Sequence, residues 1–293
     1  MASGEGIASE MSLGEVVSET FNLFQRDFVK YFVLFAVVEA VIGVVTILAH
    51  QAVQIPAVPT SPTDLSWLPG YLWATFELYV IVEVITLVVL PVAEGATIKI
   101  AAEAIEGKRM SLGASVRFAF SKLVWMWAVS LIVGVVVILG FVALIVPGII
   151  LAIMLCLALP ALLLENTGVL GSLSRSRELV SHRWLKTFAT FLVLGLIVVV
   201  IAAVLGVVGG LFGGASPVAT GILSAFYEPI LPIALTVYFF SNRARVSPSS
   251  PTSQAAIASG PAPMPGMKFC PNCGTQLLAS ATFCSNCGAK QPA

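Results

Sequence analysis

Charged side chains are scarce in this sequence. Only 10% of its 293 residues are Asp, Glu, Lys or Arg and 58% are hydrophobic, whereas a soluble domain has about 25% charged residues. Such a chain cannot cover a water-exposed surface with polar groups, which excludes an ordinary soluble protein. A formal net charge of zero gives no overall basic field for nucleic acid. The composition is that of a multipass membrane protein.

Cysteine, histidine and signal-peptide features are scarce as well. Four of the five cysteines lie in one terminal motif and Cys156 stands alone, so no disulfide framework of an exported domain is visible. The first 30 residues lack the basic region, short apolar core and cleavage site of a signal peptide. His50 and His182 are the only histidines and fall into no catalytic pattern. We therefore expect no enzyme.

Apolar runs of about 20 residues, the length needed to cross a bilayer, predict six transmembrane helices. They are residues 31–50, 72–94, 122–146, 149–164, 187–208 and 220–241. The third and fourth come from one charge-free run, which Pro147 and Gly148 divide because proline removes a backbone donor and glycine accepts turn geometry. One long tilted helix is the alternative. The predicted fold class is an all-α integral membrane protein.

Basic residues segregate to one side of the predicted bilayer. If the N-terminus is cytosolic, all fifteen Lys and Arg residues fall in cytosolic segments. The outer connections, which are residues 51–71, the Pro147 turn and "GGLFGGASPVA", contain none. The positive-inside rule then predicts a plasma-membrane protein with both termini in the cytosol.

An internal repeat is visible at the predicted cytosolic face. The segment "MSLG" begins at Met11 and again at Met110, and a weaker echo begins at Val169. We expect three pseudo-repeated units, each an interfacial helix followed by a hairpin, with coincidence as the alternative. In the first copy, Ser12 and Glu15 fit a capping box at the start of an amphipathic helix.

Four cysteines at the C-terminus form a metal-binding pattern. Two C-x2-C pairs are separated by ten residues, and each pair is flanked as F-C-x-N-C-G; the cysteines are Cys270, Cys273, Cys284 and Cys287. Four thiolates satisfy tetrahedral zinc and leave no open position, so we expect one structural Zn²⁺. A module this small needs the metal to fold. A redox dithiol or an iron site explains two matched pairs less well.

The terminal motif resembles the short zinc ribbons at the ends of many prokaryotic, especially archaeal, membrane proteins. That resemblance implies contact with a protein and less often with nucleic acid. Lys268 and Lys290 are the only charges in the module, too few for a nucleic-acid footprint. We therefore expect a cytosolic protein partner, with an inert appendage and nucleic acid as alternatives.

The chain divides into four predicted regions. Residues 1–30 are a cytosolic N-terminus with the interfacial helix, and residues 31–245 are the transmembrane domain in contact with the lipid bilayer. Residues 246–267 are a linker rich in Pro, Ser and Ala without charge, and residues 268–293 are the zinc ribbon. The composition of the linker is typical of a disordered tether.

Carboxylates inside the predicted spans form a possible intramembrane polar site, since these spans hold no Lys or Arg to neutralise them. They are Glu39, Glu77, Glu83 and Glu228. Counting residues from each span entry puts Glu39 and Glu83 at similar depth and Glu77 and Glu228 nearer the outer face. One interpretation is a proton or cation path. We favour the other, neutral carboxyls hydrogen-bonded between packed helices.

Residues 12–241 resemble the multipass family named after the membrane domain of glycerophosphoryl diester phosphodiesterases. "SLGEVVSETFNLFQRDFVKYF", "EAIEGKRMSLGASV" and the segment from "VPGIILAIM" to "SHRWLKTF" carry the resemblance. The family pattern of PG, a short span, Pro, Glu and R-S-x-x-L-V is matched by Pro147, Gly148, Pro160, Glu165, Arg175, Ser176, Leu179 and Val180. The resemblance implies a membrane domain without the catalytic barrel, in which Arg175 pairs with Glu165 or with lipid phosphate.

Together these observations predict a non-enzymatic membrane protein whose zinc ribbon recruits a cytosolic partner, in membrane or envelope homeostasis. The alternative is a small transporter or channel that uses the intramembrane carboxylates.

Overall fold

A computed structural model of the chain describes residues 7, 9–56, 65–211, 217–246, 267–270, 276–278, 280–283 and 290. The chain forms two compact units, residues 1–246, called here the membrane unit, and residues 247–293, called the terminal unit. The helices are α1 (Leu13–Arg26), α2 (Phe28–Ala52), α3 (Leu68–Ile105), α4 (Leu112–Ala143), α5 (Ile145–Leu155), α6 (Ala158–Glu165), α7 (Gly168–Val180), α8 (Trp184–Leu211), α9 (Pro217–Ser224) and α10 (Ile230–Val246). The strands are β1 (Met267–Phe269) and β2 (Gln276–Leu278).

Five segments of the membrane unit are long and apolar enough to cross a bilayer. They are Phe28–Ala52, Leu68–Ile105, Leu112–Ala143, Ile145–Glu165 and Trp184–Gly209. The chain is therefore a helical protein of the multipass membrane type. The sixth predicted span is not confirmed, because a turn containing Glu228 and Pro229 divides it into α9 and α10.

The hairpin expected at Pro147 breaks three residues earlier. Leu144 has extended backbone angles, φ −167° and ψ 155°, and separates α4 from α5. Pro147 instead lies in the first turn of α5, where its missing N–H has no intrahelical acceptor to lose. Gly148 allows close packing, since a Cβ there would lie 2.5 Å from the ring of Phe141.

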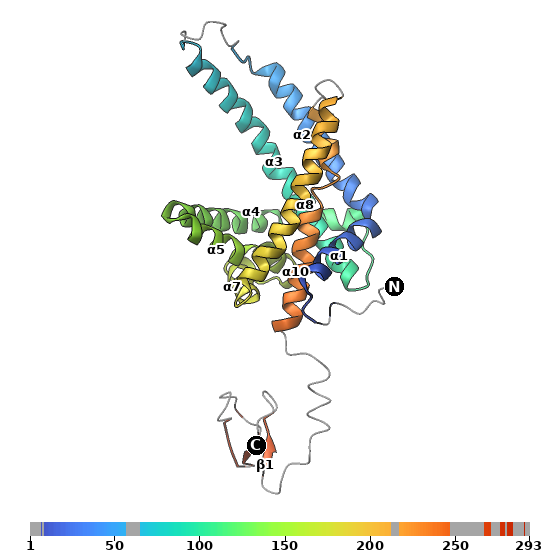
Figure 1. Cartoon of the computed structure of the whole chain (residues 1–293), viewed down its shortest axis with the longest axis vertical. Helices are drawn as coiled ribbons and strands as arrows, with labels where there is room; N and C mark the ends of the chain where they lie inside the picture. Colours follow the sequence, from blue (N-terminus) through green and yellow to red (C-terminus); the bar gives the residue numbers. More distant parts are fainter. Residues whose placement is uncertain are drawn as a thin grey trace. The chain divides into compact units, whose positions relative to one another are not determined.

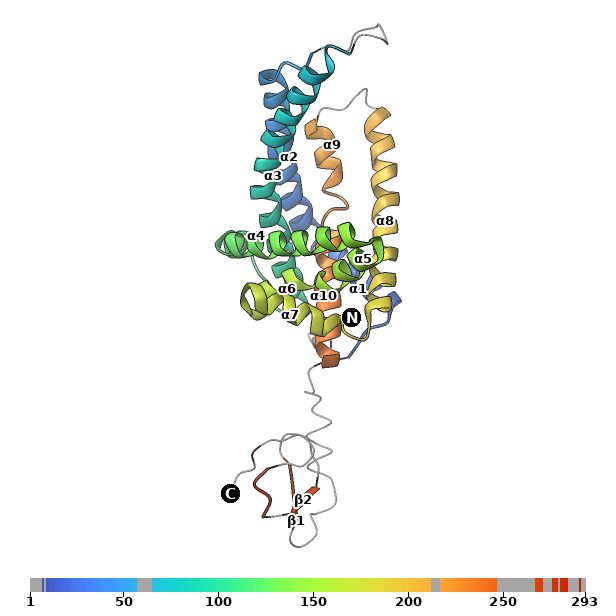
Figure 2. The same ribbon diagram turned by 90° about the vertical axis from the view of Figure 1, so that its left-hand side faces the viewer.

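The helices of the membrane unit do not all run in one direction. In Figures 1 and 2, α2, α3 and α8 share a general direction, whereas α4 and α5 lie across it. The predicted three-fold repeat is not confirmed either. In the first copy, the interfacial helix α1 ends at Arg26 before α2 begins. In the second copy, the corresponding segment is the first part of α4, which continues from Leu112 without a break.

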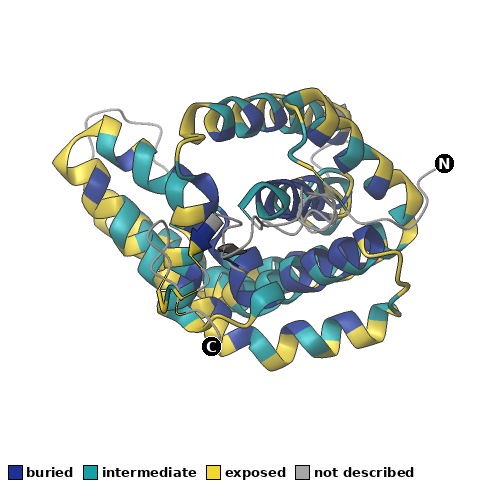
Figure 3. Cartoon of the chain, turned by 90° about the horizontal axis from the view of Figure 1, so that it is seen from below, coloured by how far each residue is buried: buried dark blue, intermediate teal, exposed yellow. Residues whose placement is uncertain are grey.

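The largest cluster of buried side chains gathers around α10. Figure 3 shows buried residues toward the middle of the unit and exposed residues on its outer helices. Fully buried side chains of α10 include Ile233, Val237, Tyr238 and Phe239. They pack in one cluster with buried residues of α1, α3, α6 and α7. The last helix of the unit is thus the one that the others surround.

The start of α1 has the capping box that its sequence predicts. The Ser12 N–H donates to Glu15 Oε2 at 2.6 Å, and the Glu15 N–H donates to Ser12 Oγ at 3.3 Å. These bonds satisfy two donors that lack an intrahelical acceptor. Val16 and Leu23 lie on the face of α1 that is turned away from solvent, and they join the core around α10.

A side chain of α4 compensates for the proline inside α3. Pro91 has no N–H, so the Leu87 carbonyl lacks its usual donor four residues on. The Trp127 Nε1–H of α4 donates to that carbonyl at 2.6 Å. Because a bilayer offers no water for an unpaired backbone group, this bond also fixes α4 against α3.

Candidate functional site

The carboxyl groups of Glu39 and Glu228 meet inside the membrane unit. Glu39 belongs to α2 and Glu228 to the turn between α9 and α10, and their carboxyl groups lie close enough for their charges to interact. Two glycines let the helices approach this closely. A Cβ on Gly43 would lie 2.7 Å from the Val218 backbone, and one on Gly221 would lie 2.9 Å from Glu39 Oε2. Small residues thus bring α9 onto α2 at the carboxyl pair.

A third carboxyl, that of Glu94 in α3, lies close enough to Glu228 for their charges to interact. Sequence reasoning missed Glu94 because the predicted span ended there, whereas α3 continues to Ile105. The small and apolar residues after Glu94 gave a signal for that continuation. Of the other predicted carboxylates, Glu77 is exposed and Glu83 partly exposed on α3.

The three clustered carboxyls, Glu39, Glu94 and Glu228, form no ion pair with Lys or Arg within the described part of the chain. One oxygen of Glu228 is buried without a hydrogen-bond partner there. Apolar surroundings make such charges costly unless protons or a cation neutralise them. The described residues contain no group of three or more His, Cys, Asp or Glu placed to hold a metal ion.

The R-S-x-x-L-V segment lies in α7, and its Ser, Leu and Val side chains are buried in the membrane unit. The Ser176 hydroxyl accepts from the Leu157 N–H at 3.1 Å and donates to the Met154 carbonyl at 2.8 Å. It thereby bridges the break between α5 and α6, where both backbone groups would otherwise lack partners. Leu179 and Val180 are fully buried in the cluster around α10.

Arg175 pairs with Glu165, one of the two partners that its sequence context suggests. Its Nε donates to Glu165 Oε2 at 2.8 Å and its Nη2 donates to Oε1 at 3.1 Å, a two-bond arrangement. Arg175 also contacts Glu178 at 2.8 Å, and Arg243 of α10 lies 3.9 Å from Glu165. The pair thus ties the end of α6 to α7 and α10.

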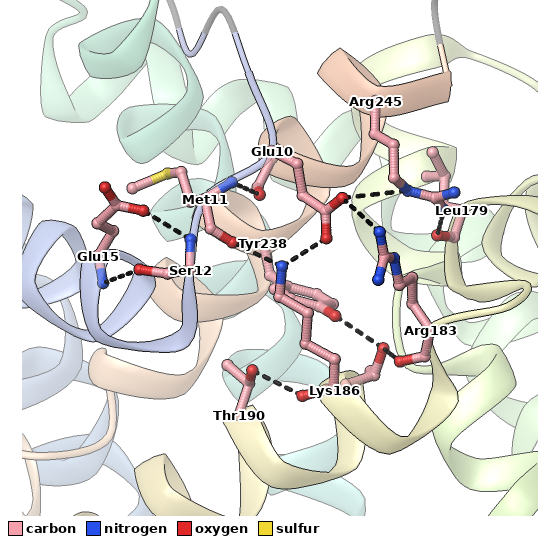
Figure 4. Close-up of polar contacts among 12 residues, drawn as sticks. Glu10, Met11, Ser12, Glu15, Leu179, Arg183, Lys186, Thr190, Tyr238 and Arg245 are labelled. Carbon is pink, nitrogen blue, oxygen red and sulfur yellow. Dashed lines mark hydrogen bonds and ion pairs between the residues drawn. The ribbon is translucent and has the colours of Figure 1, made fainter.

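A second ionic cluster holds the N-terminal segment against α8 and α10 (Figure 4). The Glu10 carboxylate accepts from Lys186 and from Arg183, the latter at 3.2 Å, and lies 4.0 Å from Arg245. Lys186 also donates to the Met11 carbonyl at 2.8 Å. Partial burial raises the pKa of Glu10, but the Lys186 hydrogen bond and the neighbouring charges outweigh it and hold the pKa below its ordinary value.

The terminal unit contains one two-stranded pairing and one isolated bridge that enclose segments of equal length. Strands β1 and β2 are antiparallel, with Phe269 opposite Gln276. An antiparallel bridge joins Phe283 to Lys290, so each pair brackets six residues of the chain. In each bracket the cysteines occupy the first and fourth positions.

Cys270 is buried next to β1. Cys273, Cys284 and Cys287 lie outside the described residues. Two C-x2-C pairs, each enclosed by an antiparallel pairing, have the donor set and spacing of a tetrahedral Zn²⁺ site. The spacing of the two motifs therefore fits the predicted metal.

Residues 269–291 match the zinc-ribbon domain family. This match supports zinc binding by the terminal unit and covers only that part of the chain. No curated protein and no solved structure matches the chain.

Proposed function

We propose that this chain is a non-enzymatic multipass protein of the plasma membrane whose cytosolic zinc ribbon recruits a protein partner, in membrane or envelope homeostasis. The observation that carries the proposal is the zinc-ribbon match over residues 269–291, in a compact unit distinct from the membrane unit. Zinc bound by the four thiolates would hold the two C-x2-C motifs together and leave no open position for catalysis. With Lys268 and Lys290 as its only charges, the ribbon suits a protein surface better than nucleic acid.

Metal analysis combined with partner capture tests this proposal. We expect one zinc per wild-type chain and none in a Cys273→Ser, Cys287→Ser variant, which still inserts into the membrane. The matched control is Cys156→Ala, which removes a cysteine outside the motif and keeps the zinc. A partner captured by the control and lost by the double variant supports recruitment by the ribbon. A partner that the zinc-free variant retains contradicts it.

The proposed orientation rests on the positive-inside rule and has its own test. Cysteines placed at Ser66 and Ser249 should differ in labelling by an impermeant thiol reagent applied to intact cells. We expect the Ser66 position to react and the Ser249 position to stay silent. The reverse pattern would show that the topology is inverted.

We also propose that the membrane unit belongs with the membrane domains of glycerophosphoryl diester phosphodiesterases. Support comes from the residues that carry the resemblance: Arg175 pairs with Glu165, and Ser176 bridges a helix break. Leu179 and Val180 are buried. These roles explain why such a pattern accompanies a short, interrupted span.

The clustered carboxyls favour a second candidate function, a proton-linked transporter. Glu39 and Glu94 both lie within charge-interaction range of Glu228, where α9 gives way to α10. A helix break inside a membrane frees backbone carbonyls that can line a path. Proteoliposomes with a pH gradient test it. Flux that disappears in Glu228→Gln but persists in the exposed control Glu77→Gln would favour transport, whereas absence of flux in the wild type would favour packed, neutral carboxyls.

A further inference from the structure

A basic cavity lies where α1 meets α2 and α3 turns toward α4. Its volume is about 470 Å³. Its polar lining consists of Arg26, Asp27, Lys30, Lys108 and Arg109, with the Gly107 backbone beside them. Four cations and one anion leave a net positive charge inside the cavity.

The anions near this cavity do not neutralise its cations. Asp27 accepts from both Arg26 at 3.2 Å and Lys30 at 2.6 Å, so one carboxylate serves two cations. Lys108 pairs with Glu106 at 2.7 Å. Arg109 is exposed and forms no hydrogen bond or ion pair within the described part of the chain. The cavity therefore presents at least one complete guanidinium and a positive surplus to an incoming anion.

An apolar groove lies about one helical turn along α2 from the basic cavity. It has a volume of about 360 Å³, and its lining is entirely apolar. Residues that line it include Val33 and Val37 of α2, Val92 of α3, and Leu112, Val116 and Phe120 of α4.

The two cavities share two walls. Along α2, Val33 and Val37 lie one and two turns beyond Lys30 on the same face, because residues three and four apart are neighbours on a helix. Toward α4, Leu112 follows Arg109 and Met110 of the basic cavity in the chain. Val37 is 59% and Phe120 66% exposed, so none of the described residues of the membrane unit covers the groove.

We propose that one phospholipid with a net negative headgroup occupies this composite site, its phosphate in the basic cavity and an acyl chain in the apolar groove. A soluble phosphate would fill only the cavity and leave the groove without a ligand. A zwitterionic lipid would gain less, because its headgroup brings a positive charge among the four cations. The continuity of a positive cavity with an apolar groove matches an anionic lipid in both its parts.

The test uses the full chain in nanodiscs of phosphatidylcholine with graded phosphatidylglycerol, and native mass spectrometry counts the retained lipids. We expect the wild type to retain one phosphatidylglycerol in preference to phosphatidylcholine. The Lys108→Gln, Arg109→Gln variant should lose about thirtyfold in that preference, since each of the two basic residues near a lipid surface contributes about 1 kcal/mol. The matched control is Arg117→Gln, Arg177→Gln, which removes two exposed charges outside the cavity and should keep the preference.

The groove is tested separately from the charges. Val37→Trp fills the groove without changing charge and should displace the retained lipid, whereas Val199→Trp on the exposed face of α8 should not. Equal loss in both charge variants would show a general surface effect and overturn the proposal. Unchanged binding in Val37→Trp, or displacement of the lipid by millimolar inorganic phosphate, would assign the cavity to a soluble anion and also overturn it.

Discussion

Removing the Ser176 hydroxyl should destabilise the membrane unit by disconnecting α7 from the break between α5 and α6. The side chain is fully buried and satisfies two backbone groups, the Leu157 N–H and the Met154 carbonyl. An unsatisfied buried backbone group costs about 1–3 kcal/mol, whereas side-chain hydrogen bonds between membrane helices average about 0.6 kcal/mol. For two groups, Ser176→Ala should therefore lower the free energy of unfolding by about 1–6 kcal/mol.

The matched control for this change is Ser174→Ala, an exposed serine two residues earlier in the same helix. Helix propensity changes equally at both positions, so the difference between the variants isolates the buried hydroxyl. Unfolding in mixed micelles, followed by circular dichroism over an SDS titration, measures both. A difference below about 0.5 kcal/mol would refute the reasoning, since it would fall under even the membrane average for two bonds.

Three further changes test other contacts. Trp127→Phe should cost about 1 kcal/mol because it removes the donor to the carbonyl that the proline in α3 leaves free, whereas the exposed Trp125→Phe should cost little in the same titration. The Glu10 cluster should stabilise the N-terminal segment above about pH 4.5 and release it as the pH falls through the lowered pKa of Glu10. Hydrogen exchange at the Met11 amide measures this release, and Glu10→Gln should remove its pH dependence. Chelation of zinc should increase exchange in the terminal unit and leave α10 protected; protection that persists throughout the terminal unit would contradict a structural metal.

The local features of the fold could be predicted because each depends on neighbours in sequence. Ser12 and Glu15 are one helical turn apart, so their capping box follows from spacing alone. Apolar length likewise predicts membrane helices. The helix break predicted at Pro147 is three residues too late, because proline suits the first turn of a helix as well as a turn between helices.

The long-range contacts could not be predicted, because apolar length fixes neither the direction nor the neighbours of a helix. Counting depth along ideal spans put Glu39 beside Glu83, but α2 packs on α9, and so Glu39 meets Glu228. The position of Glu94 near Glu228 could be predicted only by knowing that α3 continues past the apolar run. Hydropathy also gives no indication that α4 and α5 lie across the direction of the other helices.

The central position of α10 has a consequence for biosynthesis. At about 5–20 residues per second, a ribosome needs seconds to add residues 212–246 after α8 is complete. During that interval the earlier helices have entered the bilayer, but the side chains that will surround Tyr238 and Phe239 have no partner. Membrane entry and tertiary packing are therefore separate events in time, and a premature stop before Ile230 would yield an inserted chain that quality-control proteases can recognise as unfinished.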